Sequence, residues 1–323
     1  MALEAKREIA LGTGMTAGEG EQMNGRVHRI HTRLLLLLLL FLLALSPSAS
    51  RAENLAANGK PIVYFGVIPR YNPILMYRSY QPMMDYLTEH TPYHFELKLA
   101  KDYPEAVDFL RRGTVDVASL GDVTFTEARR EFGAIPILKP LNAGGVPYYR
   151  SFIIVREDSP IESIADLRGK SVAFGDLHST SGNLIPRDLL FRHGISLFDL
   201  GSYENLESHD AVVKAVLKGK VDAGAVKDVM ALRYQAHGLR FIGQSEPIPS
   251  VPIVVRRDTP PALVAAISQA LLAIDPRNPV QQARMSQWDP EFRNGFVVAS
   301  DEDYLSIYLL MNGVKSGCGQ QCH

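Results

Sequence analysis

An alternation of strand-like and helix-like segments from Pro61 to Met311 limits this chain to α/β folds. Short apolar runs rich in Val, Ile and Phe predict the strands, and amphipathic segments between them predict the helices. The expected strands cover 61–67, 94–99, 115–120, 135–138, 151–156, 171–174, 221–226, 239–242 and 253–257. The expected helices cover 76–88, 102–112, 123–132, 183–193, 208–218, 228–237, 260–274, 280–288 and 301–311.

An internal similarity between two parts of the chain predicts two related α/β lobes. Residues 106–118 and 212–224 align without a gap at an offset of 106, and each contains an apolar helix, a glycine and a strand that opens with Val-Asp. The same offset pairs Tyr103 with His209 and Asp122 with Asp228. These positions fall at helix starts or strand ends, the edges at which open α/β sheets bind ligands. The alternative is a coincidental recurrence of a common helix–strand unit.

Three consecutive hydroxyl residues, Ser179, Thr180 and Ser181, are followed by Gly182 at the start of an expected helix. A helix start offers unpaired backbone N–H groups and the positive end of the helix dipole. Together with three hydroxyl groups, these donors favour a binding site for a tetrahedral oxyanion. The alternative is an ordinary helix cap, since Ser and Thr are common there whatever the function.

The first 52 residues have the three-part pattern of a secretory signal peptide. Arginines precede the apolar run Leu34 to Leu45, and small residues follow it up to Ala52. We expect cleavage near Ala52, and the alternative is an uncleaved membrane anchor. Because no cysteine follows the apolar run directly, no lipid attachment is expected, and the product is predicted to be soluble and exported.

Charge and cysteine content narrow the possible partners. Without residues 1–52, the chain has 28 Lys and Arg against 31 Asp and Glu, a net charge of −3 that provides no basic field for nucleic acid or an anionic membrane. The two cysteines, Cys318 and Cys322, lie in the tail, where an oxidising compartment favours a local disulfide. The alternative, a metal site with His323, needs more ligands than the tail supplies.

Several motifs in this order resemble those of the periplasmic substrate-binding proteins of phosphonate and phosphite ABC transporters. The similarity covers about residues 60–275. It rests on Tyr149-Arg150-Ser151, Asp166-Leu167-Arg168-Gly169-Lys170, Phe174-Gly175-Asp176, Ser179-Thr180-Ser181-Gly182, Pro186, His209 and Val221-Asp222-Ala223-Gly224. The Ser-Thr-Ser-Gly turn at its distance from Asp-Leu-Arg-Gly-Lys is the most specific of these motifs.

The resemblance implies a two-lobed, type II periplasmic-binding-protein fold. Each lobe would be a mainly parallel sheet flanked by helices, and crossover strands would form the hinge. We expect lobe 1 over 60–150 plus 258–312, lobe 2 with the crossover strands over 151–257, and a tail over 313–323.

The resemblance also implies the binding residues. Ser179, Thr180, Ser181 and Gly182 would hold the phosphoryl oxygens, and His209 would donate from the same lobe. The remaining expected site residues are Tyr103 and Tyr149, which would close over the ligand, and Asp228, which falls near an acidic position that binds the amine of aminoalkyl phosphonates. From the residues alone, His209 could equally be a surface cap residue and the two tyrosines core residues.

One departure from the family pattern bears on the ligand. Lys227, beside Asp228, is not the residue expected there, and no second acid is evident. This disfavours an aminoalkyl ligand and favours phosphate, phosphite or a simple alkylphosphonate.

The predicted function is that of an exported, monomeric solute-binding protein that captures a small phosphorus oxyanion and delivers it to an ABC permease in the inner membrane. The alternative is a sensing module of the same fold that signals to a membrane kinase. An enzyme is disfavoured, because the chain has no Gly-x-Ser-x-Gly elbow, metal-ligand cluster or nucleotide-binding glycine motif. No cofactor and no metal are expected.

Overall fold

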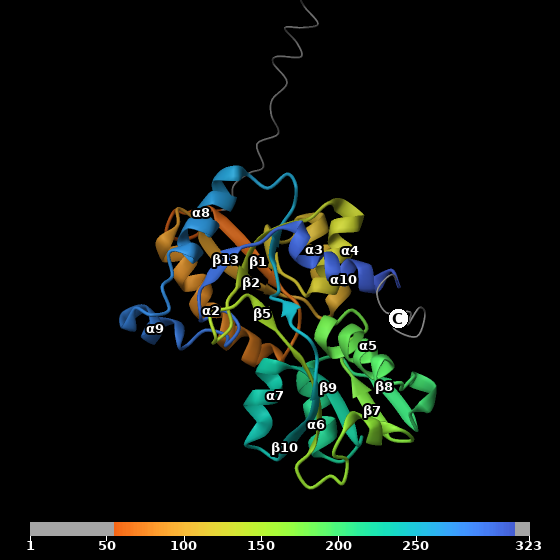
Figure 1. The fold of residues 1–323 in the computed structure, drawn as a ribbon. Coiled ribbons are helices and arrows are strands. Elements are labelled where there is room, and N and C mark those ends of the chain that lie inside the picture. The colour runs from red at the N-terminus through yellow and green to blue at the C-terminus, as the bar shows by residue number, and fades with distance from the viewer. Residues whose placement is uncertain (1–54, 314–323) are drawn as a thin grey trace, which may run out of the picture. The chain divides into compact units, whose positions relative to one another are not determined.

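Two mixed β-sheets organise residues 55–313, the part of the chain that the computed structural model describes (Figure 1). The predicted signal peptide and its cleavage site, and the predicted pairing of Cys318 with Cys322, lie outside these residues. All the described residues belong to one compact unit.

The first sheet has six strands in the order β13-β4-β12-β3-β1-β2. These strands are β1 (Ile62–Val67), β2 (His94–Leu99), β3 (Val117–Ser119), β4 (Ile135–Pro140), β12 (Ile253–Val255) and β13 (Phe296–Val298). The accompanying helices are α2 (Pro73–His90), α3 (Tyr103–Arg112), α4 (Asp122–Phe132), α8 (Pro261–Leu272), α9 (Pro279–Met285), η4 (Asp301–Tyr304) and α10 (Leu305–Met311).

The second sheet has five strands in the order β10-β6-β9-β7-β8. These strands are β6 (Ser151–Arg156), β7 (Ser171–Phe174), β8 (Ser202–Asn205), β9 (Ala223–Lys227) and β10 (Leu239–Gln244). The helical segments are η1 (Ile164–Leu167), the π-helix η2 (Thr180–Leu184), α5 (Ile185–Arg192), η3 (Leu197–Asp199), α6 (His209–Leu217) and α7 (Asp228–Gln235).

A two-stranded ladder marks where the chain passes between the sheets. β5 (Tyr148–Tyr149) precedes the second sheet, and β11 (Ile248–Pro249) follows it and pairs antiparallel with β5. β12, which we grouped with the second lobe from the sequence, pairs with β3 and β4 in the first sheet. The predicted lobe boundaries remain a prediction.

The α/β class and the helix-flanked sheets are confirmed, but the sheets are not mainly parallel. In the first sheet, β1 pairs parallel with β2 and β3, whereas β12 and β13 pair antiparallel with their neighbours. In the second, β6 pairs antiparallel with β9 and β10. β6 and β12 are the strands that follow each passage of the chain between the sheets, and both run antiparallel to their neighbours.

The core forms where apolar helix faces cover the sheets. In α2, Met76, Tyr80, Met83 and Leu87 recur at spacings of three and four and are all buried, as expected for one face of a helix. Burial of each such side chain contributes about 1.5–3 kcal/mol to folding.

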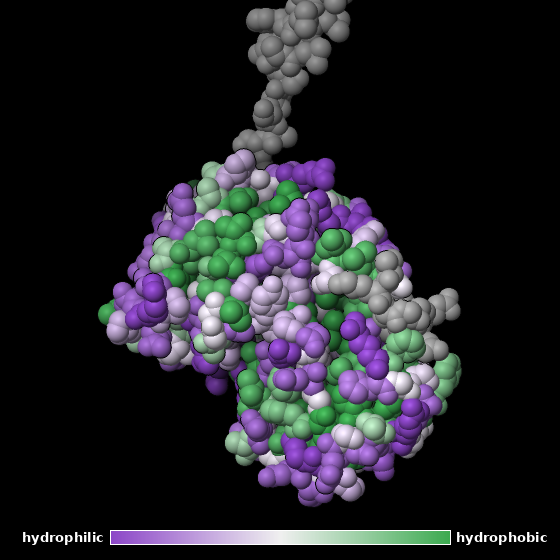
Figure 2. Space-filling view, in the orientation of Figure 1, coloured by the Kyte–Doolittle hydropathy of each residue, from purple (hydrophilic) through white to green (hydrophobic). Residues whose placement is uncertain are grey.

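The surface of the described unit is mixed in character. Figure 2 shows hydrophobic patches interrupted by hydrophilic residues on the visible face. None of the helices between residues 55 and 313 combines the length and the hydropathy that crossing a bilayer requires.

Candidate functional site

The three predicted hydroxyl residues open the π-helix η2 between β7 and α5. Ser179 caps this helix, and its Oγ accepts a hydrogen bond from the N–H of Gly182 at 3.0 Å. The carbonyl of Ser179 accepts from the N–H groups of Asn183 and Leu184, both at 3.1 Å. Thus Ser179 is indeed a helix cap, as the simpler interpretation held, and its side chain still lies at the site.

The backbone at this helix start retains free donors. Within residues 55–313, no hydrogen bond from the N–H of Thr180 or Ser181 is found. The side chains of both residues are buried, so water cannot easily satisfy these donors. Two unpaired N–H groups beside buried hydroxyls make an anion receptacle chemically possible here.

Gly182 is required by close packing in this turn. A Cβ atom at this position would lie 2.8 Å from Ser179 Oγ, 3.0 Å from Gly175 Cα and 3.0 Å from His209 Cε1. One of these neighbours is backbone and cannot move without shifting the turn. The absence of a side chain therefore allows the imidazole of His209 to approach the hydroxyl-rich helix start.

His209 lies at the start of α6 and is buried beside Gly182. Its Nδ1 accepts a hydrogen bond from the N–H of Lys227 at 3.4 Å. Burial, with the positive charges of Lys227 and Arg70, lowers the pKa of His209 to about 3. The ring is therefore neutral near pH 7, and because Nδ1 accepts, the proton sits on Nε2, which can donate to a ligand.

The two predicted tyrosines contact the hydroxyl residues. Tyr103, the first residue of α3, is buried with its side chain close to Ser179, and burial raises its pKa to about 12. Tyr149 is also buried, and its hydroxyl donates to Asp122 Oδ2 at 3.2 Å and lies close to Thr180. The structure thus brings both tyrosines to the helix start, with their protons retained.

Asp228 has a different environment. Its Oδ2 accepts from the N–H of Arg150 at 3.3 Å, and its Oδ1 accepts from the N–H of Val229 at 2.7 Å. The carboxyl group of Asp228 thus connects the start of α7 to Arg150, the residue between β5 and β6. No contact of Asp228 with the Ser-Thr-Ser turn is found among the described residues, so its part in ligand binding stays a prediction.

Sequence reasoning missed a buried charge cluster next to this site. Glu291 forms ion pairs with Arg70 and with Lys227, and all three side chains are almost fully buried. Lys227 Nζ also lies 3.6 Å from the centre of the Tyr149 ring, and Arg70 donates to Ser119 Oγ at 3.3 Å. From the sequence, Lys227 was noted only because it differs from the residue expected in the family at this position.

Asp122 was also missed as a site residue, although the internal offset pairs it with Asp228. It opens α4, and its carboxyl group is fully buried, with no partner for Oδ1 among the described residues. Its neighbour Val123 donates its N–H to Thr180 Oγ1 at 3.0 Å. The start of α4 is therefore in direct contact with the start of η2.

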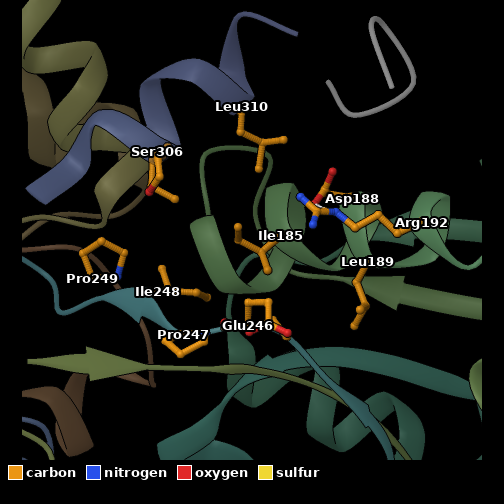
Figure 3. A pocket seen from close by; sticks show the side chains of 12 residues that line it. Ile185, Asp188, Leu189, Arg192, Glu246, Pro247, Ile248, Pro249, Ser306 and Leu310 are labelled. Carbon is orange, nitrogen blue, oxygen red and sulfur yellow. Dashed lines mark hydrogen bonds and ion pairs between the residues drawn. The ribbon is translucent and has the colours of Figure 1, made fainter. Parts of the chain in front are cut away.

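A cavity of about 400 Å³ adjoins Tyr149 and Lys227. Its wall includes the loop 141–144, the face of α7 that carries Asp228 and Arg233, and residues of the segment 290–294. Another cavity, of about 260 Å³, lies between α5, the segment 245–249 and α10 (Figure 3). Ile185 and Leu310 face each other across it, and none of the predicted site residues lines it.

The comparison with protein families agrees with this arrangement. Residues 65–304 match the model of a family described as the periplasmic substrate-binding protein of phosphonate ABC transporters. The chain belongs to this family. Its members are substrate-binding components of transporters rather than enzymes, and they are periplasmic proteins.

Two curated relatives support the assignment. The phosphonates-binding periplasmic protein of Escherichia coli is 26% identical over 288 residues, covering 85% of this chain and 83% of that protein. The phosphate-import protein PhnD of Mycolicibacterium smegmatis is 30% identical over 198 residues, covering 56% of this chain and 60% of that protein. The match thus spans less than two thirds of the mycobacterial relative.

Solved structures confirm the type II periplasmic-binding-protein fold of this family member. A binding protein of an ABC phosphonate transporter from Pseudomonas aeruginosa has a TM-score of 0.70 at 23% identity, with 78% of this chain and 86% of that chain covered. PhnD1 of Prochlorococcus marinus, solved with methylphosphonate, has a TM-score of 0.70 at 18% identity, with 79% and 98% covered.

Proposed function

We propose that this family member captures a small phosphorus oxyanion in the periplasm and delivers it to an ABC permease of the inner membrane. The ligand would be phosphate, phosphite or a phosphonate, held at the start of η2. The observation that carries the proposal is the convergence of Ser179, Thr180 and Ser181 with His209, Tyr103 and Tyr149 around two free backbone N–H groups.

The binding chemistry follows from the donors at this point. The N–H groups of Thr180 and Ser181, the serine and threonine hydroxyls and the Nε2–H of His209 would donate to the ligand oxygens. Hydrogen bonds to a charged acceptor are worth about 1.5–3 kcal/mol each, so a few of them suffice for micromolar binding after ordering costs. The hydroxyls of Tyr103 and Tyr149 would also donate to the ligand oxygens.

The positive charges of Arg70 and Lys227 favour an anion at this site. Within residues 55–313, both cations form their ion pairs with the same carboxylate, Glu291. Since the site is buried, the positive charges act in a medium of low dielectric and attract an anion more strongly than they would at the surface. Neither cation was required by the sequence motif.

Capture would proceed by closure of the two sheet-bearing parts of the chain around the ligand. Contacts between them are present at Val123 with Thr180, at Glu127 with His178 (2.9 Å) and at Lys227 with Glu291. A bound anion would add donors from both parts to these contacts and so shift the population toward the closed form. The closed form would then dock on the permease.

The relatives named above are transport components, so we do not propose the sensing role. The ligand itself is best identified by a thermal-shift screen of the purified protein, because a ligand that binds only the folded state stabilises it by about 2.7 kcal/mol at one hundred times its Kd.

In this screen we expect phosphate, phosphite or methylphosphonate to raise the melting temperature. Sulfate, methanesulfonate and glycine serve as controls of similar size. A rise with sulfonates or amino acids alone would contradict the proposed ligand class.

A further inference from the structure

The cavity beside Tyr149 lies next to the proposed phosphoryl site. Tyr149 forms part of the cavity wall, and its side chain lies close to Thr180. Lys227 also lines the cavity, and its backbone N–H donates a hydrogen bond to Nδ1 of His209. A substituent on a phosphorus atom held at η2 would therefore extend toward this space. At about 400 Å³, the cavity has room for a short organic chain.

The acidic groups in this wall are already engaged. Both oxygens of Asp228 accept backbone N–H groups, from Arg150 and Val229. The two oxygens of Glu291 face Arg70 and Lys227, one each. A ligand ammonium group would have to displace these partners to find an ionised oxygen.

Two arginines in the same wall, Arg233 and Arg293, form no ion pair within residues 55–313, although Arg233 lies near the buried carboxyl group of Asp289. Arg233 stacks over the ring of Tyr71 at 4.9 Å, and its Nη1 is buried without a hydrogen-bond acceptor among the described residues. Arg293 is exposed, and no ion pair of its guanidinium is found within residues 55–313.

We propose that this cavity binds an anionic group on the substituent of the ligand, so that the preferred ligand is a phosphonate bearing a carboxylate. Arg233 and Arg293 would bind the carboxylate, and an arginine fork suits a planar carboxylate geometrically. The proposal rests on the proposed function, because it takes the phosphoryl group to be held at η2.

Titration calorimetry with three phosphonates tests this inference. Methylphosphonate probes the phosphoryl site alone, phosphonoacetate adds a carboxylate, and 2-aminoethylphosphonate adds an ammonium group. We expect phosphonoacetate to bind at least tenfold more tightly than methylphosphonate, and 2-aminoethylphosphonate to bind no more tightly than methylphosphonate.

Variants then assign the preference to the cavity. Arg233→Gln and Arg293→Gln should each reduce the affinity for phosphonoacetate about tenfold and leave that for methylphosphonate within twofold. Arg130→Gln, which removes an exposed arginine outside this cavity, should change neither affinity. Unchanged methylphosphonate binding also shows that each variant is folded, and Arg293 is exposed, so its replacement does not disturb the core.

The possible failures are distinguishable. Equal affinities for phosphonoacetate and methylphosphonate, tighter binding of 2-aminoethylphosphonate, or a preference that survives both substitutions would overturn the cavity assignment and leave the proposed function intact. Absence of binding by all three phosphonates, by phosphite and by phosphate would overturn the proposed function, and the cavity assignment with it.

Discussion

Lys227 and Glu291 form a buried ion pair in which the side chains are only 3% and 5% exposed. Lys227 ends β9 of the second sheet, whereas Glu291 lies between α9 and β13 of the first. The pair therefore joins the two sheet-bearing parts of the chain beside the proposed ligand site. Since Glu291 also pairs with Arg70, it holds two buried cations at once.

This arrangement predicts unequal effects of removing the two partners. Glu291→Gln leaves Arg70 and Lys227 buried without an ionised partner, and we expect a loss of about 3–5 kcal/mol in the free energy of unfolding. Lys227→Met leaves Glu291 paired with Arg70, so the loss should be smaller. Chemical denaturation of both variants measures the difference, and an equal or larger loss for Lys227→Met would contradict the shared role of Glu291.

A methyl group at Gly182 is expected to disrupt the turn. Gly182→Ala would place Cβ within 3.0 Å of Gly175 Cα and His209 Cε1, and such overpacking typically costs about 1–3 kcal/mol. Gly121→Ala is the matched control, because its Cβ would meet its nearest neighbours at 3.6 Å, an ordinary contact distance. Thermal unfolding should show a clearly larger loss for Gly182→Ala, and similar losses would argue against close packing at this turn.

The lowered pKa of His209 predicts that the free energy of unfolding decreases in acid. Its folded pKa of about 3 lies below the ordinary value of about 6.5, so the unfolded chain binds the proton more readily between these values. The neutral His209 therefore contributes fully to the free energy of unfolding above about pH 6.5. This contribution falls by about 1.4 kcal/mol for each pH unit down to about pH 3. Denaturant unfolding at pH 6.5 and 4.5 should show a smaller decrease for His209→Asn than for the unchanged protein; equal decreases would contradict the lowered pKa.

The raised pKa of Asp122 predicts that the free energy of unfolding decreases as the pH rises. Burial raises its pKa to about 8, despite the attraction of Lys227, so the folded state keeps a proton that the unfolded chain has lost. Its stabilisation is present below the ordinary pKa of about 4 and is lost as the pH rises to about 8. Asp122→Asn cannot ionise, so relative to the unchanged protein it should gain stability between pH 5 and 8.5. A constant difference in unfolding free energy over this range would contradict the raised pKa.

The local sequence predicted the elements that depend on neighbouring residues. The strands 94–99, 151–156 and 171–174 are observed at their predicted bounds, because apolar residues alternate with polar ones in the first and form runs in the other two. The helix predicted over 183–193 begins instead as the π-helix Thr180–Leu184, whose widened turn forms where the Ser179 carbonyl accepts the N–H of Leu184. The Ser-Thr-Ser residues were found from the sequence, but this geometry was not.

Features that depend on distant residues were missed. β13 has three residues and exists by pairing with β4, far earlier in the chain. The ion pair of Arg70 with Glu291 joins residues 221 positions apart. No periodicity or spacing in either segment indicates these contacts. For Asp122, one feature of the sequence could have indicated a site residue. The internal offset of 106 aligns it with Asp228, which stands at another helix start.

The central claim is that the Ser-Thr-Ser turn binds a phosphorus oxyanion. The most direct measurement is titration calorimetry of methylphosphonate and phosphate against the purified protein and its Ser179→Ala/Ser181→Ala variant. Ser163→Ala/Ser196→Ala is the control, because these serines cap the short helices η1 and η3 and take no part in the proposed site.

We predict that the unchanged protein and the control bind at least one of the two anions with the same affinity. The Ser179→Ala/Ser181→Ala variant should bind it at least tenfold more weakly, because each lost donor is worth about 1.5 kcal/mol or more. Affinity that is unchanged in this variant would contradict the site, and absence of binding by the unchanged protein to either anion would contradict the ligand class.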